Sequence, residues 1–280
     1  MRAVPESLVA RVRRAVEASG PLCVGIDPSA AVVAAWGRRD GARGVEYVAR
    51  TLLASCAPFA SALKVQVAFF ERLGAAGFAA LEATLREARD TGALVIADAK
   101  RGDIGSSNEG YAQAWLEDGA PLAVDALTVS PYLGVAALQP LIERAALTGR
   151  GVFVLARTSN PEGRGIQEAR TISGAAVADE VVARVRELNA GVAAGATGIV
   201  LGATAPAPAA GLNGLGGAIL VPGVGAQGGT EQDVRRLTQG AERSSVLVSV
   251  SRALTDSGPD ARGLATAARA WRERLAQTLT

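Results

Sequence analysis

The chain has 280 residues, of which 49% are hydrophobic and 20% are charged, and its formal net charge is +2. This composition is too apolar for a disordered protein, and a nearly balanced charge without a basic block argues against a nucleic-acid partner. No apolar run reaches the roughly 18 residues that a membrane span needs, and residues 1–20 are typical of an amphipathic helix rather than a signal peptide. Cys23 and Cys56 lie in apolar segments, as buried thiols of a reducing compartment do. We therefore expect a soluble, cytoplasmic protein that has no membrane partner.

Short apolar runs alternate with amphipathic helical patterns along the whole chain. After the helix expected within residues 1–20, eight runs are typical of buried strands: Leu22–Ile26, Ala62–Val67, Ala93–Ala97, Ala123–Val129, Gly151–Ala156, Thr197–Leu201, Ala218–Val221 and Val246–Val250. Helical patterns follow at residues 45–57, 79–92, 110–120, 176–194 and 264–279. Strands separated by helices predict parallel βαβ units, and eight of them predict a closed (β/α)8 barrel, an α/β fold that takes about 250 residues as one domain.

The connection after the sixth expected strand differs from the others. Residues 205–217 are so rich in Pro and Gly that the helix there should be short or absent. An open doubly wound sheet is the alternative architecture, but the turn after the first strand reads GIDPSA instead of GxGxxG. We find no repeat or linker that divides the chain. We therefore predict a single TIM-barrel domain over residues 1–280, with an N-terminal helix and a reduced helix after the sixth strand.

Two residue types are unusually scarce. The chain has no histidine, which excludes the serine and cysteine triads and nearly all zinc catalysis. Of its 29 basic residues, only Lys64 and Lys100 are lysines, although lysine is ordinarily common. Such a bias toward arginine indicates that a retained lysine stands where a guanidinium would not serve, because an ammonium can release its proton and a guanidinium cannot. The alternative interpretation is that the two lysines were retained by chance and have no function.

Both lysines are predicted to face the mouth of the barrel, where TIM-barrel active sites lie. In the second strand Lys64 alternates with apolar residues that must face the helices, so its own side chain faces inward. Asp98 and Lys100 end the third strand on one face, Asp103 follows on a glycine-bearing turn, and Asp27 ends the first strand. These side chains are therefore expected to converge on one cleft.

Pairing of opposite charges would offset the cost of burying charged side chains in such a cleft. A buried lysine and a buried carboxylate each carry a desolvation penalty that only pairing offsets. A row of Lys64, Asp98, Lys100 and Asp103 could keep all four groups ionised, because each charge has opposite neighbours. A purely structural ion-pair network is the alternative, but the position at the carboxyl ends of strands favours function.

A second candidate site follows the seventh and eighth strands. The segment PGVGAQGG, residues 222–229, lets the backbone approach a ligand closely, and Thr230 then starts a helix whose N-terminus should favour an anion. Arg252, at the end of the eighth strand, can add a charge-assisted contact. Many barrels build a phosphate site from these two loops. The sequence thus predicts a phosphate ester that faces the Lys/Asp row.

These residues resemble orotidine 5′-phosphate decarboxylase, in particular the longer bacterial subgroup whose signature reads DAKRGDIG, here residues 98–105. The resemblance runs from about residue 5 to the C-terminus. It also covers VGIDP (24–28), ALKVQ (62–66), LTVSPYLG (127–134), RTSNPEG (157–163), LGATAP (201–206) and VPGVGAQGG (221–229).

The resemblance implies a role for each residue of the charged row. Lys100 would deliver a proton to carbon 6 of the pyrimidine as CO₂ leaves, and its ammonium would stabilise the vinyl carbanion. Asp98 would lie beside the departing carboxylate, and Lys64 would orient Asp98 and touch a ribose hydroxyl. Asp103 and Ile104 would reach into the site of a partner subunit, so the active form would be a homodimer with shared sites.

The resemblance also assigns the rest of the substrate, orotidine 5′-phosphate. Asp27 would bind the ribose, Ser159 the pyrimidine edge and Arg252 the phosphate, while Gln227 would bridge base and phosphate. It implies that the reaction needs neither a metal ion nor an organic cofactor. One departure from the pattern is Ser251, which stands before Arg252 where many relatives have glycine.

Three other functions are consistent with parts of this pattern. Sugar-phosphate decarboxylases and hexulose-phosphate synthases share a similar DxKxxD signature but use Mg²⁺ with an added acidic ligand, and Lys64 stands where that ligand would lie. A Schiff-base aldolase needs a nucleophilic lysine, whereas Asp98 and Asp103 would keep Lys100 protonated. A non-catalytic pyrimidine-nucleotide-binding protein would have no need of all four charged residues.

Overall fold

The computed structural model describes residues 5–191, 193–209 and 211–279. All eight strands are parallel, and each pairs with its neighbour in sequence order until β8 closes on β1. The predicted closed (β/α)8 barrel is therefore confirmed. The strands are β1 (Leu22–Ile26), β2 (Ala62–Gln66), β3 (Leu94–Arg101), β4 (Ala126–Val129), β5 (Gly151–Arg157), β6 (Thr197–Leu201), β7 (Ile219–Pro222) and β8 (Val246–Val250).

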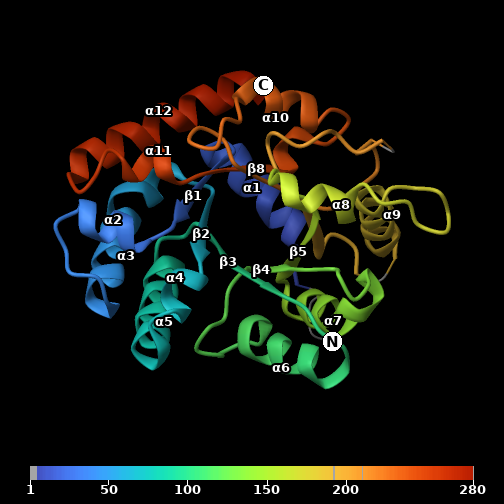
Figure 1. Ribbon diagram of the computed structural model, residues 1–280, viewed down its shortest axis with the longest axis horizontal. Coiled ribbons are helices and arrows are strands. Elements are labelled where there is room, and N and C mark those ends of the chain that lie inside the picture. Colours follow the sequence, from blue (N-terminus) through green and yellow to red (C-terminus); the bar gives the residue numbers. More distant parts are fainter. Residues whose placement is uncertain (1–4, 192, 210, 280) are drawn as a thin grey trace.

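Helices surround the barrel on its outside (Figure 1). They are α1 (Leu8–Ser19), α2 (Ala30–Ala35), α3 (Ala42–Cys56), α4 (Ala68–Glu71), α5 (Gly74–Asp90), α6 (Gly105–Leu116), α7 (Gln139–Thr148), α8 (Arg164–Gln167), α9 (Val177–Ala190), α10 (Glu231–Leu237), α11 (Arg252–Thr255) and α12 (Ala261–Leu279). Short 3-10 turns are η1 (Ala57–Phe59), η2 (Val135–Leu138), η3 (Pro161–Gly163) and η4 (Arg243–Ser245). In the described ranges, none of these helices combines the length and apolarity needed to cross a bilayer.

β1, β6 and β8 have the predicted bounds, and the other strands differ at one or both ends by one to four residues. Helices α5 and α6 each begin five residues before the predicted start. β3 continues to Arg101, four residues past its expected end at Ala97, so Lys100 lies within the strand. β4 begins at Ala126 instead of Ala123. Within the described residues between β6 and β7 there is no helix, as the Pro- and Gly-rich connection predicted.

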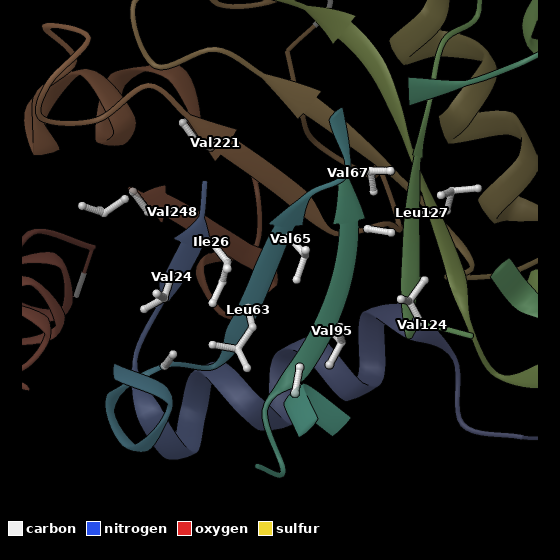
Figure 2. Packing of buried hydrophobic residues seen from close by; sticks show 14 of the residues in the cluster. Val24, Ile26, Leu63, Val65, Val67, Val95, Val124, Leu127, Val221 and Val248 are labelled. Atoms are coloured by element: carbon white, nitrogen blue, oxygen red, sulfur yellow. The ribbon is translucent and has the colours of Figure 1, made fainter. Parts of the chain in front are cut away.

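The outer faces of the strands carry the apolar residues that hold the helices. In α3 the buried positions recur with helical spacing, at Val45, Val48, Leu52 and Cys56 among others, which gives the helix one apolar side. These residues join strand residues such as Leu63 in one core cluster. Figure 2 shows strand side chains of this cluster, among them Val24, Leu63, Val65 and Val95.

The inner faces of the strands form a second cluster, which α1 closes. Leu8, Val9 and Val12 of α1 pack with inward strand residues, including Ala62 and Phe153. Figure 2 shows α1 running beneath the amino-terminal ends of β1, β2 and β3. The amino-terminal end of the barrel is therefore sealed by apolar side chains, and the carboxyl ends of the strands form the other end, where the site lies.

The two cysteines behave as predicted. Cys23 and Cys56 are free and fully buried. Burial raises the pKa of each thiol to about 12. Both therefore stay protonated at neutral pH and pack as small apolar side chains.

Candidate active site

A chain of ion pairs crosses from β2 to β3 at the carboxyl ends of the strands. The Nζ atom of Lys64 lies 3.0 Å from Oδ2 of Asp98, and the Nζ atom of Lys100 lies 2.6 Å from Oδ1 of the same carboxylate. Parallel pairing of β2 with β3 sets Gln66 beside Asp98, and the Gln66 amide donates to Oδ2 at 3.1 Å. The convergence of Lys64, Asp98 and Lys100 predicted from strand alternation is thus present.

Charge explains how this cluster tolerates burial. Lys64 is 5% exposed and Asp98 is 9% exposed. Burial alone would lower the pKa of the Lys64 ammonium, but the charges of Asp27 and Asp98 outweigh it and hold that pKa above its ordinary value. Burial alone would raise the pKa of the Asp98 carboxyl, but Lys64 and Lys100 hold it well below its usual range. Both groups are therefore ionised at neutral pH.

Lys100 differs from Lys64 in exposure and in backbone conformation. Its side chain is 47% exposed, so its ammonium can meet a ligand in the mouth. Its φ is +49°, and among the described residues it is the only one other than glycine with a positive φ. The pairing of β3 with β4 also shifts register between Ala97 and Arg101. Strained backbone of this kind is stored at functional sites when the surrounding structure holds it in place.

Asp27 joins the cluster from the end of β1. Its Oδ1 atom lies 3.7 Å from the Nζ atom of Lys64 and is buried without a hydrogen-bond partner among the described residues. A buried acceptor of this kind ordinarily has a partner. The Asp27 side chain as a whole is 25% exposed, so Oδ2 is the oxygen that a ligand hydroxyl could reach, and the ribose contact stays a prediction.

Asp103 lies outside the cluster of its own chain, which corrects the picture of one four-membered row. In the described part of the chain it forms no ion pair with Lys64 or Lys100. Instead its backbone amide donates to the Asn108 side chain, and its Oδ1 accepts from the Ile104 amide. Ile104 itself is 62% exposed at the start of α6. Asn108 thus ties the loop to the following helix, with Ile104 exposed and Asp103 half-buried.

The glycine-rich loop after β7 brings two predicted ligand contacts together. Gly223 has a φ of +97°, and a Cβ added there would lie 2.9 Å from Oε1 of Gln227 and 3.7 Å from Oγ of Ser159. Glycine at this position thus leaves room for the end of the Gln227 side chain, with Ser159 at ordinary contact distance. Hydrogen bonds within the loop, such as Gly228 N–H to Gly225 O at 2.8 Å, preset its shape.

The helix after this loop begins at Thr230, as predicted, and its first turn contains a capping box. Thr230 caps helix α10, and the Asp233 carboxylate completes the cap. Thr230 and Asp233 bond to each other reciprocally, with the Thr230 amide donating to the Asp233 side chain at 3.0 Å. Glu231 adds a further negative charge in the first turn. Glu231 is paired with Arg274, so the Asp233 carboxylate is what makes this N-terminus less favourable for an anion than the sequence predicts. Arg252 with the glycine loop remains the candidate phosphate contact.

Arg252 and its neighbour Ser251 lie where β8 leads into α11. The Arg252 side chain is exposed, and within the described residues no carboxylate lies within 4.0 Å of it. The unusual Ser251 is accommodated by β1, since a Cβ added at Gly25 would lie only 2.6 Å from the Ser251 Cβ. Glycine in β1 thus provides the space that a glycine at position 251 would otherwise provide.

Sequence reasoning missed two residues of the cluster, Gln66 and Thr128. Thr128 is buried on β4, and its hydroxyl lies 2.9 Å from Oδ1 of Asp98. A threonine inside an apolar run looks like an ordinary strand residue, so only pairing with β3 could have found it. Among the described residues, no three His, Cys, Asp or Glu side chains gather in a way that could hold a metal ion.

Comparison with known proteins adds independent findings. Residues 20–267 match the model of the Orotidine 5′-phosphate decarboxylase / HUMPS family. The chain is 48% identical to the orotidine 5′-phosphate decarboxylase of Salinispora arenicola over 94% of its length and 95% of that protein, and 47% identical to that of Streptomyces coelicolor over the same shares. A crystal structure from Streptomyces avermitilis superposes with a TM-score of 0.93 at 44% identity, covering 99% of this chain and 97% of that one. Leishmania donovani OMP decarboxylase gives a TM-score of 0.77 at 29% identity, covering 98% of each chain.

Proposed function

Because this chain belongs to the Orotidine 5′-phosphate decarboxylase / HUMPS family, we propose that it converts orotidine 5′-phosphate to uridine 5′-phosphate and CO₂ without a metal ion. The observation that carries the proposal is the pair of lysines on one buried carboxylate, Asp98. Lys64 stands where the sugar-phosphate branch has an acidic metal ligand. An ammonium at that position favours the metal-free branch.

In the proposed chemical step Lys100 acts on carbon 6 of the pyrimidine. The bond between carbon 6 and the carboxylate breaks, its electron pair stays on carbon 6, and CO₂ leaves. The Lys100 ammonium then transfers a proton to carbon 6, which gives uridine 5′-phosphate and a neutral amine that takes a proton back from water. Fixed positive charge beside the developing carbanion lowers the barrier because it needs no reorganisation during the reaction.

Asp98 and Lys64 prepare that step. Two lysines and two neutral donors hold the Asp98 carboxylate, so it stays ionised and fixed beside the substrate carboxylate. Lys64 is almost fully buried, and it therefore serves to position Asp98 and to meet a ribose hydroxyl together with Asp27. Ser159 and Gln227 would contact the base, and Arg252 the phosphate.

The proposal includes a homodimer in which Asp103 and Ile104 complete the partner's site. Its support is the exposure of the apolar Ile104 side chain (62%), and the loop after β4 exposes two further large side chains, Tyr132 (76%) and Leu133 (54%). Mixing inactive Lys100→Ala and Asp103→Ala subunits tests it. Shared sites predict recovery of about a quarter of wild-type turnover, because half of the dimers are mixed and each has one intact site. No recovery after confirmed subunit exchange would contradict sharing.

The activity itself is tested by following the absorbance loss of orotidine 5′-phosphate with the purified chain in EDTA. We expect undiminished turnover in EDTA. Turnover that requires added Mg²⁺ would instead assign the chain to the sugar-phosphate branch, and binding without any turnover would favour the non-catalytic alternative.

A further inference from the structure

The hydroxyl of Thr128 lies between the backbone of Lys100 and the side chain of Asp98. The Lys100 amide donates to Oγ1 of Thr128 at 3.0 Å, and that Oγ1 lies 2.9 Å from Oδ1 of Asp98. The Lys100 ammonium returns to the same Oδ1 at 2.6 Å. Backbone amide, hydroxyl, carboxylate and ammonium thus form one closed ring of hydrogen bonds.

The direction of each bond in this ring is determined by chemistry. An amide can only donate, so Oγ1 accepts from Lys100. The Asp98 carboxylate is ionised and can only accept, so the single hydroxyl hydrogen of Thr128 must point at Oδ1. Both bonds therefore depend on one oxygen atom, and replacing that atom breaks both at once.

The ring lies where the backbone is strained. Lys100 has a φ of +49°, a strained conformation that a non-glycine residue keeps only when its surroundings hold it. The bond to Thr128 falls within the register shift between β3 and β4, where regular strand pairing between Ala97 and Arg101 is interrupted. Thr128 thus replaces part of the missing sheet pairing at the residue that must aim its ammonium at the substrate.

The same bond matters for Asp98 during the reaction. When Lys100 turns toward carbon 6, its own bond to Oδ1 weakens, whereas Thr128 still holds that oxygen. Thr128 is 1% exposed, so its hydroxyl does not reach the substrate. We propose that Thr128 is a positioning residue, whose hydroxyl holds the Lys100 backbone in its left-handed conformation and fixes Asp98 for decarboxylation.

The inference rests on the proposed function and is tested with Thr128→Val, which keeps the shape and strand preference of threonine but removes the hydroxyl. Bonds to charged groups contribute about 1.5–3 kcal/mol, so kcat should fall about 10- to 100-fold. KM and the Kd for uridine 5′-phosphate should change less than about threefold, because Thr128 does not touch the ligand. Thr128→Ser should restore kcat to within about threefold of wild type.

Thr197 provides the matched control. It is a fully buried threonine at the start of β6, and its hydroxyl has no hydrogen-bond partner among the described residues. Thr197→Val should leave kcat unchanged. Equal kcat in wild type and Thr128→Val, or failure of Thr128→Ser to restore it, would overturn the positioning role even if Thr128→Val were less stable.

A crystal structure of Thr128→Val separates this inference from the proposed function. We expect the Lys100 φ to leave the left-handed region or the Asp98 carboxylate to rotate. Unchanged geometry of both residues would overturn the inference whatever the activity is. A wild-type chain without decarboxylation would refute the proposed function alone, and the variant's geometry would still decide whether Thr128 holds the two groups.

Discussion

The two ends of the barrel interior are built from the same strands but differ in chemistry within two residues. On β2 the inward position changes from Ala62 to Lys64, and on β3 it changes from Ile96 to Asp98. Toward the amino-terminal end these side chains pack on α1, and toward the carboxyl end they form ion pairs. One strand therefore provides stability at one end and chemistry at the other.

The free energy of burying a side chain differs between the two ends, and this difference explains the division. Burying an apolar side chain at the amino-terminal end stabilises the fold by about 1.5–3 kcal/mol. Burying Lys64 and Asp98 brings desolvation penalties that their attraction only offsets, so such a pair is weak evidence of a stabilising role. Substitutions at the charged end should therefore affect turnover, and those at the apolar end should affect stability without affecting turnover.

The largest effect is expected from Asp98→Asn, which should lower both the unfolding free energy and turnover. Lys64 would remain buried without its nearest counter-charge, which costs about 3–5 kcal/mol of unfolding free energy, and turnover should collapse.

The same ion pairs make the stability of the wild type depend on pH. The folded pKa of Asp98 lies below its unfolded value of about 3.9. The stabilisation that its pairing gives is therefore complete above about pH 4 and is lost as pH falls through the folded pKa.

Denaturant unfolding of both proteins at several pH values measures this prediction. The stability difference between wild type and Asp98→Asn should be full at pH 7 and shrink on acidification. A difference that stays constant down to about pH 3 would show that the Asp98 charge does not stabilise the folded state.

The apolar end is tested with Leu8→Ala. Leu8 is 1% exposed on α1, and a Cβ added at Gly151 of β5 would lie 2.1 Å from its Cδ2, so it packs closely on the barrel. Truncation should lower the unfolding free energy by about 2–5 kcal/mol. Turnover per folded molecule, measured well below the melting temperature, should stay within about twofold of wild type. A large loss of turnover would mean that the two ends are coupled.

The smallest effect on the fold is expected from Arg252→Ala, since that side chain is exposed and unpaired within the described residues. Loss of a charge-assisted phosphate contact should reduce kcat/KM for the nucleotide about 10- to 100-fold, partly through turnover because remote binding energy helps to organise the reacting centre. Turnover of the phosphate-free nucleoside should be the same in wild type and Arg252→Ala. Arg235→Ala, an exposed arginine on α10, is the control. Unchanged nucleotide kinetics in Arg252→Ala would refute the phosphate assignment.

Periodicity was sufficient to predict the barrel and the direction of Lys64. Side chains of a strand alternate between two faces, so a polar residue between apolar residues that face the helices must face the barrel interior. It could not predict the left-handed Lys100, which depends on a bond from another strand, Thr128 on β4. The carboxylate at the helix N-terminus after Thr230 had a signal in the sequence. Thr230 and Asp233 have the spacing of a capping box, which brings a negative charge to the place where an anion would bind.

Asp103 marks a different limit. Its spacing from Lys100 suggests a single charged row, but within the described residues Asp103 pairs with neither lysine, and its side chain accepts from the Ile104 amide. A sequence reports neighbours along one chain, and a shared site is completed by residues of a second copy. The assignment of Asp103 therefore rests on the dimer test.

The central claim is that Lys100 is the proton donor of a preorganised charge cluster, and the rate of Lys100→Arg on orotidine 5′-phosphate tests it most directly. Because the Lys100 side chain is 47% exposed, arginine fits with little effect on folding, which circular dichroism can verify. A guanidinium keeps the charge but is too weak an acid to protonate carbon 6 efficiently. The account predicts that kcat falls by at least about 10²–10⁴-fold. A folded Lys100→Arg protein that keeps more than about a tenth of wild-type turnover would contradict it.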